Sequence, residues 1–140
     1  MGSSLPNRIA SYRDLIVWQR AMELVDRVYV CTTMWPSSEA YGLISQVRRA
    51  VVSVPANIAE GQSRNGRREF VHHLGIARGS LCEVETLLMV GARQRYLKDD
   101  ELNALLATST EVGKLLRGLL QSLTDAKVTR STDEPLSTHH

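Results

Sequence analysis

Apolar residues recur along four stretches of the chain at alternating steps of three and four, the spacing of one face of an α-helix. No stretch shows the strict alternation of apolar and polar residues that marks a half-buried β-strand. We therefore predict four helices that share one core. The expected core positions are Leu15, Trp18, Met22, Val25, Tyr29 and Thr32; Leu43, Val47, Ala50 or Val51, Val54 and Ile58; Phe70, Leu74, Ala77, Leu81, Val84, Leu88 and Gly91; and Leu102, Leu105, Ser109, Val112, Leu116, Leu119 and Leu123.

The connections between the predicted helices are short, so helices adjacent in sequence should run antiparallel. Ser11 is a good N-cap for the first helix, and Pro36 ends it. We predict an all-α fold, an antiparallel up-down-up-down four-helix bundle. The bundle should occupy residues 12–123, with a flexible N-terminal arm at 1–11 and a disordered C-terminal tail at 124–140.

Proline and glycine occur inside the second and third predicted helices. Pro55 lies in phase with the apolar positions, so we expect one kinked helix there, which Gly61 should end. Gly75 and Gly79 each cost about 1 kcal/mol relative to alanine in a helix interior. We therefore expect another helix backbone to approach the third helix closely at these two glycines.

Composition limits the class of protein without defining its function. Cys31 and Cys82 stand alone in the sequence, so neither a disulfide framework nor a cysteine metal site is expected. The first residues lack the apolar segment of a signal peptide, and no stretch is apolar for long enough to span a membrane. We expect a cytoplasmic protein with no membrane partner.

Polar residues lie beside core positions on the second and third predicted helices. Because an unpaired buried polar group costs about 1–3 kcal/mol, these residues should pair with one another. We interpret them as a structural polar network rather than a catalytic cluster, and we expect no catalytic residue, no metal and no cofactor. The network should consist of Arg48, Asn57, Glu60, Glu69, Ser80 and Glu83.

Arginines gather around the second predicted loop. Between Tyr41 and Arg95 there are eight arginines and four glutamates, whereas the whole chain has a net charge of only +2. Guanidinium groups bind phosphate oxygens well, so nucleic acid is a candidate partner. The alternative is a solvated loop with salt bridges to Glu60 and Glu69. The candidate nucleic-acid contacts are Arg49, Arg64, Arg67 and Arg68.

Two short spacings suggest chemistry that the rest of the chain does not complete. Glu69 and His72 have the Glu-x-x-His spacing of di-iron bundles, but such a site needs a second pair and two more glutamates. Arg67 with His72, and Arg68 with His73, have an Arg-x4-His spacing found in helical ribonucleases. There the histidine would act as general base and the arginine would stabilise the charged transition state.

Five segments carry a family likeness: YRDLIVWQRA at 12–21, YGLISQVRRAVVSVPANIAEG at 41–61, Arg64, EF at 69–70 and ARGSLCEVETLL at 77–88. In these segments the chain resembles the four-helix-bundle family of 23S rRNA intervening-sequence (S23-like) proteins. The accessory variability protein of diversity-generating retroelements is a relative in that group. The resemblance implies a homopentamer, and its retroelement members bind nucleic acid and a reverse transcriptase. This chain is less basic than those members.

Together, the pattern and the resemblance predict a non-enzymatic homo-oligomer, most simply a pentamer. It would act as an RNA- or DNA-binding adaptor linked to rRNA or to a reverse transcriptase. Two alternatives stay open on the residues alone. One is a protein-binding scaffold without nucleic-acid affinity, and the other is an Arg-x4-His ribonuclease.

Overall fold

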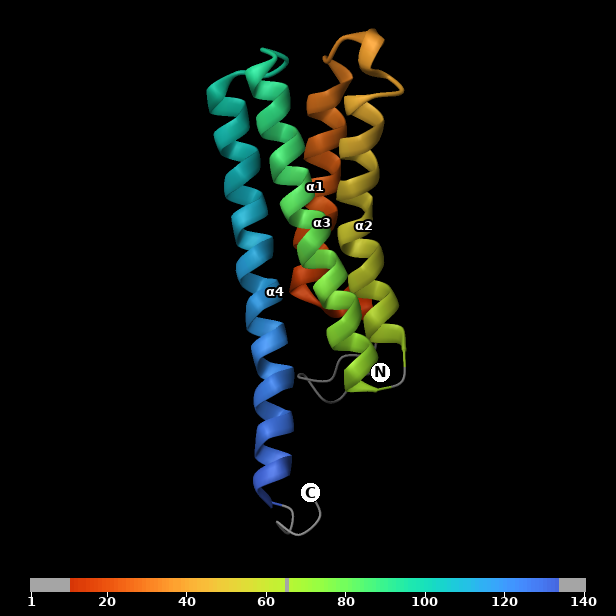
Figure 1. Cartoon of the computed structure of the whole chain (residues 1–140), viewed down its shortest axis with the longest axis vertical. Helices are drawn as coiled ribbons and strands as arrows, with labels where there is room; N and C mark the ends of the chain where they lie inside the picture. Colours follow the sequence, from red (N-terminus) through yellow and green to blue (C-terminus); the bar gives the residue numbers. More distant parts are fainter. Residues whose placement is uncertain (1–10, 65, 134–140) are drawn as a thin grey trace.

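The computed structural model describes residues 11–64 and 66–133, with side chains as far as residue 125. Within these ranges the chain forms an antiparallel up-down-up-down bundle of four α-helices and contains no strand (Figure 1). The predicted fold class is therefore confirmed. The helices are α1 (Ile16–Thr33), α2 (Leu43–Ser63), α3 (Arg67–Arg93) and α4 (Asp99–Asp133), with 3-10 turns η1 (Tyr12–Asp14) and η2 (Ser37–Glu39).

Each helix packs on its neighbours in sequence, and α1 packs against α4 to close the bundle. The pair α2 and α3 has the most extensive contact. The predicted core positions of α2, α3 and α4 are largely confirmed, because their spacing of three and four places them on one helix face. Buried members of these predicted sets are Val47, Ala50, Val51, Val54, Ile58, Leu74, Ala77, Leu81, Val84, Leu88, Leu105, Ser109, Val112 and Leu116.

The core face of α1 differs from the prediction. Its buried residues are Val17, Ala21, Leu24, Val28 and Thr32, whereas Met22 and Tyr29 are 38% and 39% exposed. The sequence of α1 contains two neighbouring apolar stripes, and spacing alone does not decide which one faces the core. The stripe that begins at Val17 faces the core, and the predicted positions Trp18 and Val25 lie beside it and are only partly buried.

The first described element begins at Tyr12, and the last helix extends beyond the predicted end of the bundle. Ser11 accepts a hydrogen bond from the Arg13 N–H, as a capping residue should, but it caps η1 and not α1. Helix α4 continues past Leu123 to Asp133, beyond the predicted start of a disordered tail, and it projects past the other helices (Figure 1). Residues 124–133 are polar but contain no proline or glycine, so nothing in them stops a helix. Residues 1–10 and 134–140 lie outside the described ranges.

Gly61 has another role than the predicted helix stop, and the close approach predicted at Gly75 and Gly79 does not occur within the single chain. Helix α2 runs through Pro55 as one helix and passes Gly61 to end at Ser63. A Cβ on Gly61 would lie 2.8 Å from the His73 Cβ, so Gly61 is where α3 approaches closely. In contrast, a Cβ on Gly75 or Gly79 would meet no described atom within 4 Å. The open glycines therefore do not serve contacts within this bundle.

Trp35 packs between the α1–α2 connection and the α3–α4 turn at one end of the bundle. Its indole is buried, packs over Gly91 and lies 5.6 Å from the Tyr96 ring, centroid to centroid. The Tyr96 hydroxyl donates to Glu39 Oε2 at 2.9 Å, and the Leu43 N–H donates to Glu39 Oε1 at 3.0 Å. The Leu43 N–H, followed by the Tyr96 hydroxyl, lowers the pKa of Glu39, and the same carboxylate raises the pKa of Tyr96. These contacts join the α1–α2 connection to the α3–α4 turn.

Arg95 ends α3 in a left-handed backbone conformation, with φ of 68°. The Tyr96 N–H donates to the Gly91 carbonyl and the Arg95 N–H to the Ala92 carbonyl, each at 2.9 Å. These two bonds form a Schellman motif, in which glycine is the preferred residue at the Arg95 position. The backbone therefore has the geometry of a Schellman motif, but arginine is less favourable than glycine at this left-handed position.

Arg95→Gly should raise the free energy of unfolding by about 0.5–1 kcal/mol. Relief of the left-handed penalty of about 1–2 kcal/mol is partly offset by the greater freedom of glycine in the unfolded chain. Urea denaturation would measure the change. The matched control, Arg93→Gly, removes the same charge inside the last helical turn and should instead destabilise by about 1 kcal/mol. Equal destabilisation by both changes would contradict this assignment.

Candidate interaction surfaces

A half-buried chain of hydrogen bonds joins α2 to α3. The Ser80 and Ser53 hydroxyl oxygens lie 2.8 Å apart, and the Asn57 amide Nδ2 donates to Ser53 Oγ at 3.0 Å and to the Ser53 carbonyl at 2.9 Å. Asn57 Oδ1 lies 3.0 Å from His73 Nδ1. Since an amide oxygen only accepts, the His73 proton must sit on Nδ1 in this arrangement.

Only part of the predicted polar network lies in this chain of bonds. Asn57 and Ser80 belong to it, whereas Glu69 and Glu83 are exposed and Glu60 pairs with Arg64 at the end of α2. Sequence reasoning did not assign Ser53 and His73 to the network. The signal for Ser53 was its place four residues before Asn57 on the same helix face. No comparable spacing signal linked His73 to α2, because that pairing depends on how the helices are aligned.

Arg48 is a bridge to α1 and not part of the α2–α3 network. Its Nε donates to Thr32 Oγ1 at 2.8 Å and its Nη2 donates to the Tyr29 carbonyl at 3.2 Å. The guanidinium also lies 4.4 Å from the centroid of the Tyr29 ring. These contacts hold a half-buried charge at the α1–α2 junction, and they explain why the exposed side of α1 carries an aromatic residue there.

The arrangement of histidines does not favour the two chemical alternatives. Arg67 and His72 are five residues apart, so their side chains leave α3 about 140° apart, and the same holds for Arg68 and His73. His73 is oriented by Asn57 through Nδ1, and neither arginine bonds to its ring. Among the described residues, no group of three or more His, Cys, Asp or Glu side chains is placed to hold a metal ion.

The candidate nucleic-acid contacts of the sequence do not form one patch. Arg49 donates to Ser45 Oγ at 3.3 Å and lies about 22 Å along α2 from Arg64, at 1.5 Å per residue. Arg64 is paired with Glu60 at 2.7 Å, and that carboxylate raises the pKa of Arg64. The two members that lie together without ion-pair partners among the described side chains are Arg67 and Arg68.

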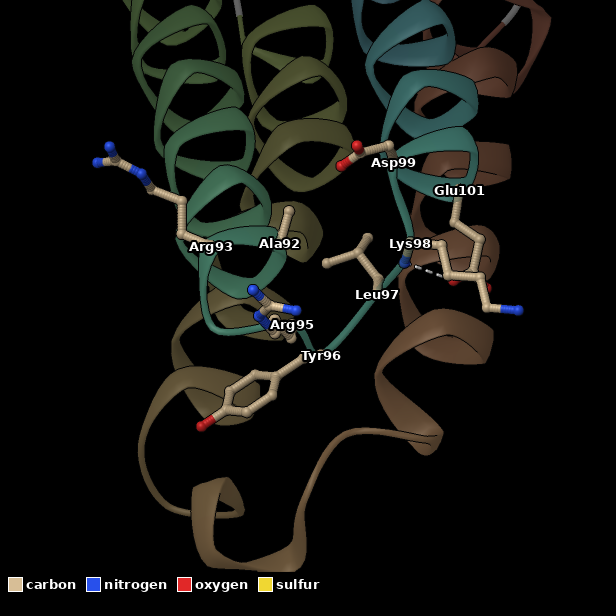
Figure 2. A pocket seen from close by; sticks show the side chains of 8 residues that line it. All are labelled: Ala92, Arg93, Arg95, Tyr96, Leu97, Lys98, Asp99 and Glu101. Carbon is tan, nitrogen blue, oxygen red and sulfur yellow. Dashed lines mark hydrogen bonds between the residues drawn. The ribbon is translucent and has the colours of Figure 1, made fainter.

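A hollow of about 680 Å³ lies at the α3–α4 turn, but its lining does not converge on one ligand (Figure 2). It combines the basic Arg95 and Lys98 with the acidic Asp99 and Glu101, and the Arg93 side chain points away from it (Figure 2). The Glu101 carboxylate accepts from the Lys98 N–H at 2.9 Å, which caps the start of α4. This end of the bundle therefore has a structural role.

Exposed apolar side chains occur on two separate faces. The first, which we name the α2–α3 face, lies on the side of α3 next to α2 and carries Ile76 and Val90, which are about 40° apart around the helix, with the open position of Gly79 beside them. The second, the α1 face, consists of the exposed residues Ile16 and Val30 on one side of α1 and of Met34, which directly follows the helix. Val30 and Met34 are 73% and 83% exposed, which is high for apolar side chains in a well-packed helix.

No helix in the described part of the chain combines the length and the apolarity needed to cross a membrane.

A family model described as 23S rRNA-intervening sequence protein matches residues 13–118. The chain is also similar to a crystal structure from Bacteroides thetaiotaomicron, described as a protein with unknown function from the S23 ribosomal protein family. The TM-score is 0.70 at 24% identity, over 76% of this chain and 96% of that chain. At this identity the likeness shows the fold. No curated protein matches the chain.

Proposed function

Because the chain belongs to the 23S rRNA-intervening sequence protein family, we propose that it is a non-enzymatic, self-associating bundle that serves as a cytoplasmic adaptor for RNA. The observation that supports this proposal is the exposure of apolar side chains on two different helices, Ile76 and Val90 on α3 and Val30, which is 73% exposed, on α1. Exposed apolar surface that gathers on one side of a protein is a mark of interaction sites. The proposed occupant of each face is another copy of this chain.

Two different faces favour a ring over a two-fold dimer. A dimer buries the same patch of both copies, whereas a closed ring joins one patch of each subunit to a different patch of the next. The α2–α3 face and the α1 face lie on different helices and supply such a pair. The number of subunits that we propose, five, comes from the family and not from these faces.

The open glycine of the α2–α3 face, Gly79, supports the same interpretation. It weakens the helix by about 1 kcal/mol relative to alanine. Within one bundle no described atom lies within 4 Å of a Cβ placed there. A helix of a neighbouring subunit would approach α3 closely at Gly79, so that contacts in the assembly would offset the loss in the isolated helix.

The non-enzymatic part of the proposal rests on how the polar groups are used. In the α2–α3 hydrogen-bond chain, Ser53, Asn57, Ser80 and His73 bond to one another. These bonds hold the two helices in register, and His73 Nε2 carries no hydrogen bond among the described residues. A catalytic site would also need a nucleophile or a charged group placed beside that nitrogen, and in the described part of the chain no hydrogen bond or ion pair brings one to it.

Ile76→Glu should break the assembly while leaving the fold of the single chain intact, because Ile76 is 40% exposed in the bundle. An unpaired charge buried in an interface costs about 3 kcal/mol or more, so association should weaken by about a hundredfold. Light scattering on a sizing column at micromolar concentration measures the mass. The control, Asn103→Glu, adds the same charge at an exposed site of α4 outside both faces.

The two variants together decide the placement of the interface. Asn103→Glu should keep the mass of the unmodified protein, while Ile76→Glu should elute with the mass of one chain and an unchanged helical circular-dichroism spectrum. An unmodified protein that is already monomeric contradicts the proposal of self-association. A fully assembled Ile76→Glu variant contradicts the use of the α2–α3 face.

A further inference from the structure

The groove between α3 and α4 carries four arginines without an ion-pair or hydrogen-bond partner among the described residues: Arg67, Arg68, Arg78 and Arg117. We propose that this groove binds the phosphodiester backbone of RNA. The inference rests on the proposed function, which names RNA as the partner. It differs from the sequence prediction because it leaves out Arg49 and Arg64 and includes Arg117, which lies far from the other arginines in the sequence.

The four arginines line two hollows along the same groove. Arg67 and Arg68 line a hollow of about 450 Å³ whose other wall is formed by α4 residues. Arg78 from α3 and Arg117 from α4 line a second hollow of about 260 Å³. Arg68 and Arg78, one in each hollow, are ten residues apart on α3, about 15 Å. Since a helical nucleic-acid strand carries a phosphate about every 3.4 Å of rise, about four nucleotides would span them.

Carboxylates are absent from the parts of the two helices that face each other between the hollows. Residues 70–82 of α3 and 112–124 of α4 contain no Asp or Glu. The acidic residue that lines the second hollow, Glu85, accepts a hydrogen bond from the Ser109 hydroxyl. The arginines therefore create a local positive potential in a protein whose net charge is only +2.

The surface between the arginines fits a phosphate backbone better than a protein partner. Protein interfaces are centred on buried aromatic or large apolar anchors. The large exposed apolar residue of the two acid-free segments is Ile76, and it leaves α3 about 160° away from Arg78. The positions that remain exposed between the two hollows are small or polar, including Gly75 on α3 and Gln121 on α4. Electrostatic attraction to arginine, without an apolar anchor, is the mode by which proteins hold a nucleic-acid backbone.

The groove is compatible with the proposed assembly. It lies on the α4 side of α3, whereas the α2–α3 face lies on the other side, so both surfaces can be occupied at once. In a ring, each copy would present the same groove. Once one groove holds an RNA, the other grooves of the ring meet the same RNA at a high effective concentration, so several weak contacts would give tighter overall binding.

Arg78→Ala combined with Arg117→Ala should weaken RNA binding about tenfold or more at 0.1 M salt and lower the slope of log affinity against log salt by about 2. Both side chains are exposed and unpaired, so folding should be unaffected. The probe is a fluorescently labelled RNA hairpin, and anisotropy is measured on the full chain at several salt concentrations. The matched control, Arg27→Ala with Arg93→Ala, removes the same charge outside the groove and should change affinity less than about threefold.

The outcomes separate the groove from the proposed function. If the unmodified protein binds the hairpin and both double variants bind equally well, the α3–α4 groove is not the RNA-binding site, while the proposal that the protein binds RNA is supported. If the unmodified protein does not bind even at low salt, both proposals are overturned. The mass of each variant is measured in parallel, and loss of binding caused only by loss of assembly would also contradict the groove.

Discussion

Trp35→Ala is expected to lower the free energy of unfolding by about 3–5 kcal/mol, the range for removing a large buried aromatic side chain. Whole domains are stable by only about 5–15 kcal/mol, so this single change should remove a large share. The indole is 4% exposed, and its Cη2 lies 2.6 Å from where a Cβ on Gly91 would be. Alanine would leave a void beside both Gly91 and Tyr96, at the junction that joins the two connections of this bundle end.

Urea denaturation at fixed protein concentration measures this effect, since self-association would also contribute to stability. Tyr41→Ala is the matched control, because Tyr41 is an aromatic residue of the same connection and is fully exposed. It should change the free energy of unfolding by no more than about 0.5 kcal/mol. If Trp35→Ala lowers the free energy of unfolding by less than about 1 kcal/mol, the packing of Trp35 does not stabilise this end of the bundle as described.

Gly61→Leu is the second change with a large expected effect, a loss of about 2–3 kcal/mol from overpacking. At Gly61 a Cβ would lie 2.8 Å from the His73 Cβ, 3.1 Å from Phe70 Cδ1 and 3.3 Å from the Phe70 carbonyl oxygen. The carbonyl belongs to the backbone of α3 and cannot move away alone. Leucine would therefore push α3 away from α2 and strain the Asn57–His73 hydrogen bond.

Gly118→Leu is the control for this effect, because it makes the same substitution inside a helix where no described atom lies within 4 Å of the new Cβ. There the better helix propensity of leucine should stabilise the protein by up to about 1 kcal/mol. If α3 packs closely against Gly61, thermal unfolding should show a lower melting temperature for Gly61→Leu and a higher one for Gly118→Leu than for the unmodified protein. Stabilisation by both substitutions would contradict it.

The fold could be predicted because three of the four helices carry a single apolar stripe that matches the helical repeat. The face of α1 could not, since its sequence offers two adjacent stripes and only packing against α2 and α4 selects between them. Gly61 and Gly79 show the same limit. Both are glycines in helices, and whether a neighbouring helix fills the space in front of them depends on the alignment of α2 with α3.

The candidate surfaces were predicted only in part, for a similar reason. Sequence reasoning grouped arginines that are near in sequence, and so it placed Arg64 beside Arg67. In the structure Arg64 is neutralised by Glu60, four residues earlier on the same helix, a spacing that the sequence does display. The partner of Arg78 in the groove, Arg117, comes from another helix, and only the antiparallel packing of α3 and α4 brings the two together.

Native mass spectrometry of the unmodified full chain at micromolar concentration directly tests the proposed assembly of the bundle into a closed ring through two different faces. We expect one dominant species with the mass of five copies of the 15.6 kDa chain. A single chain at every concentration tested, or a two-fold dimer as the largest species, would contradict it.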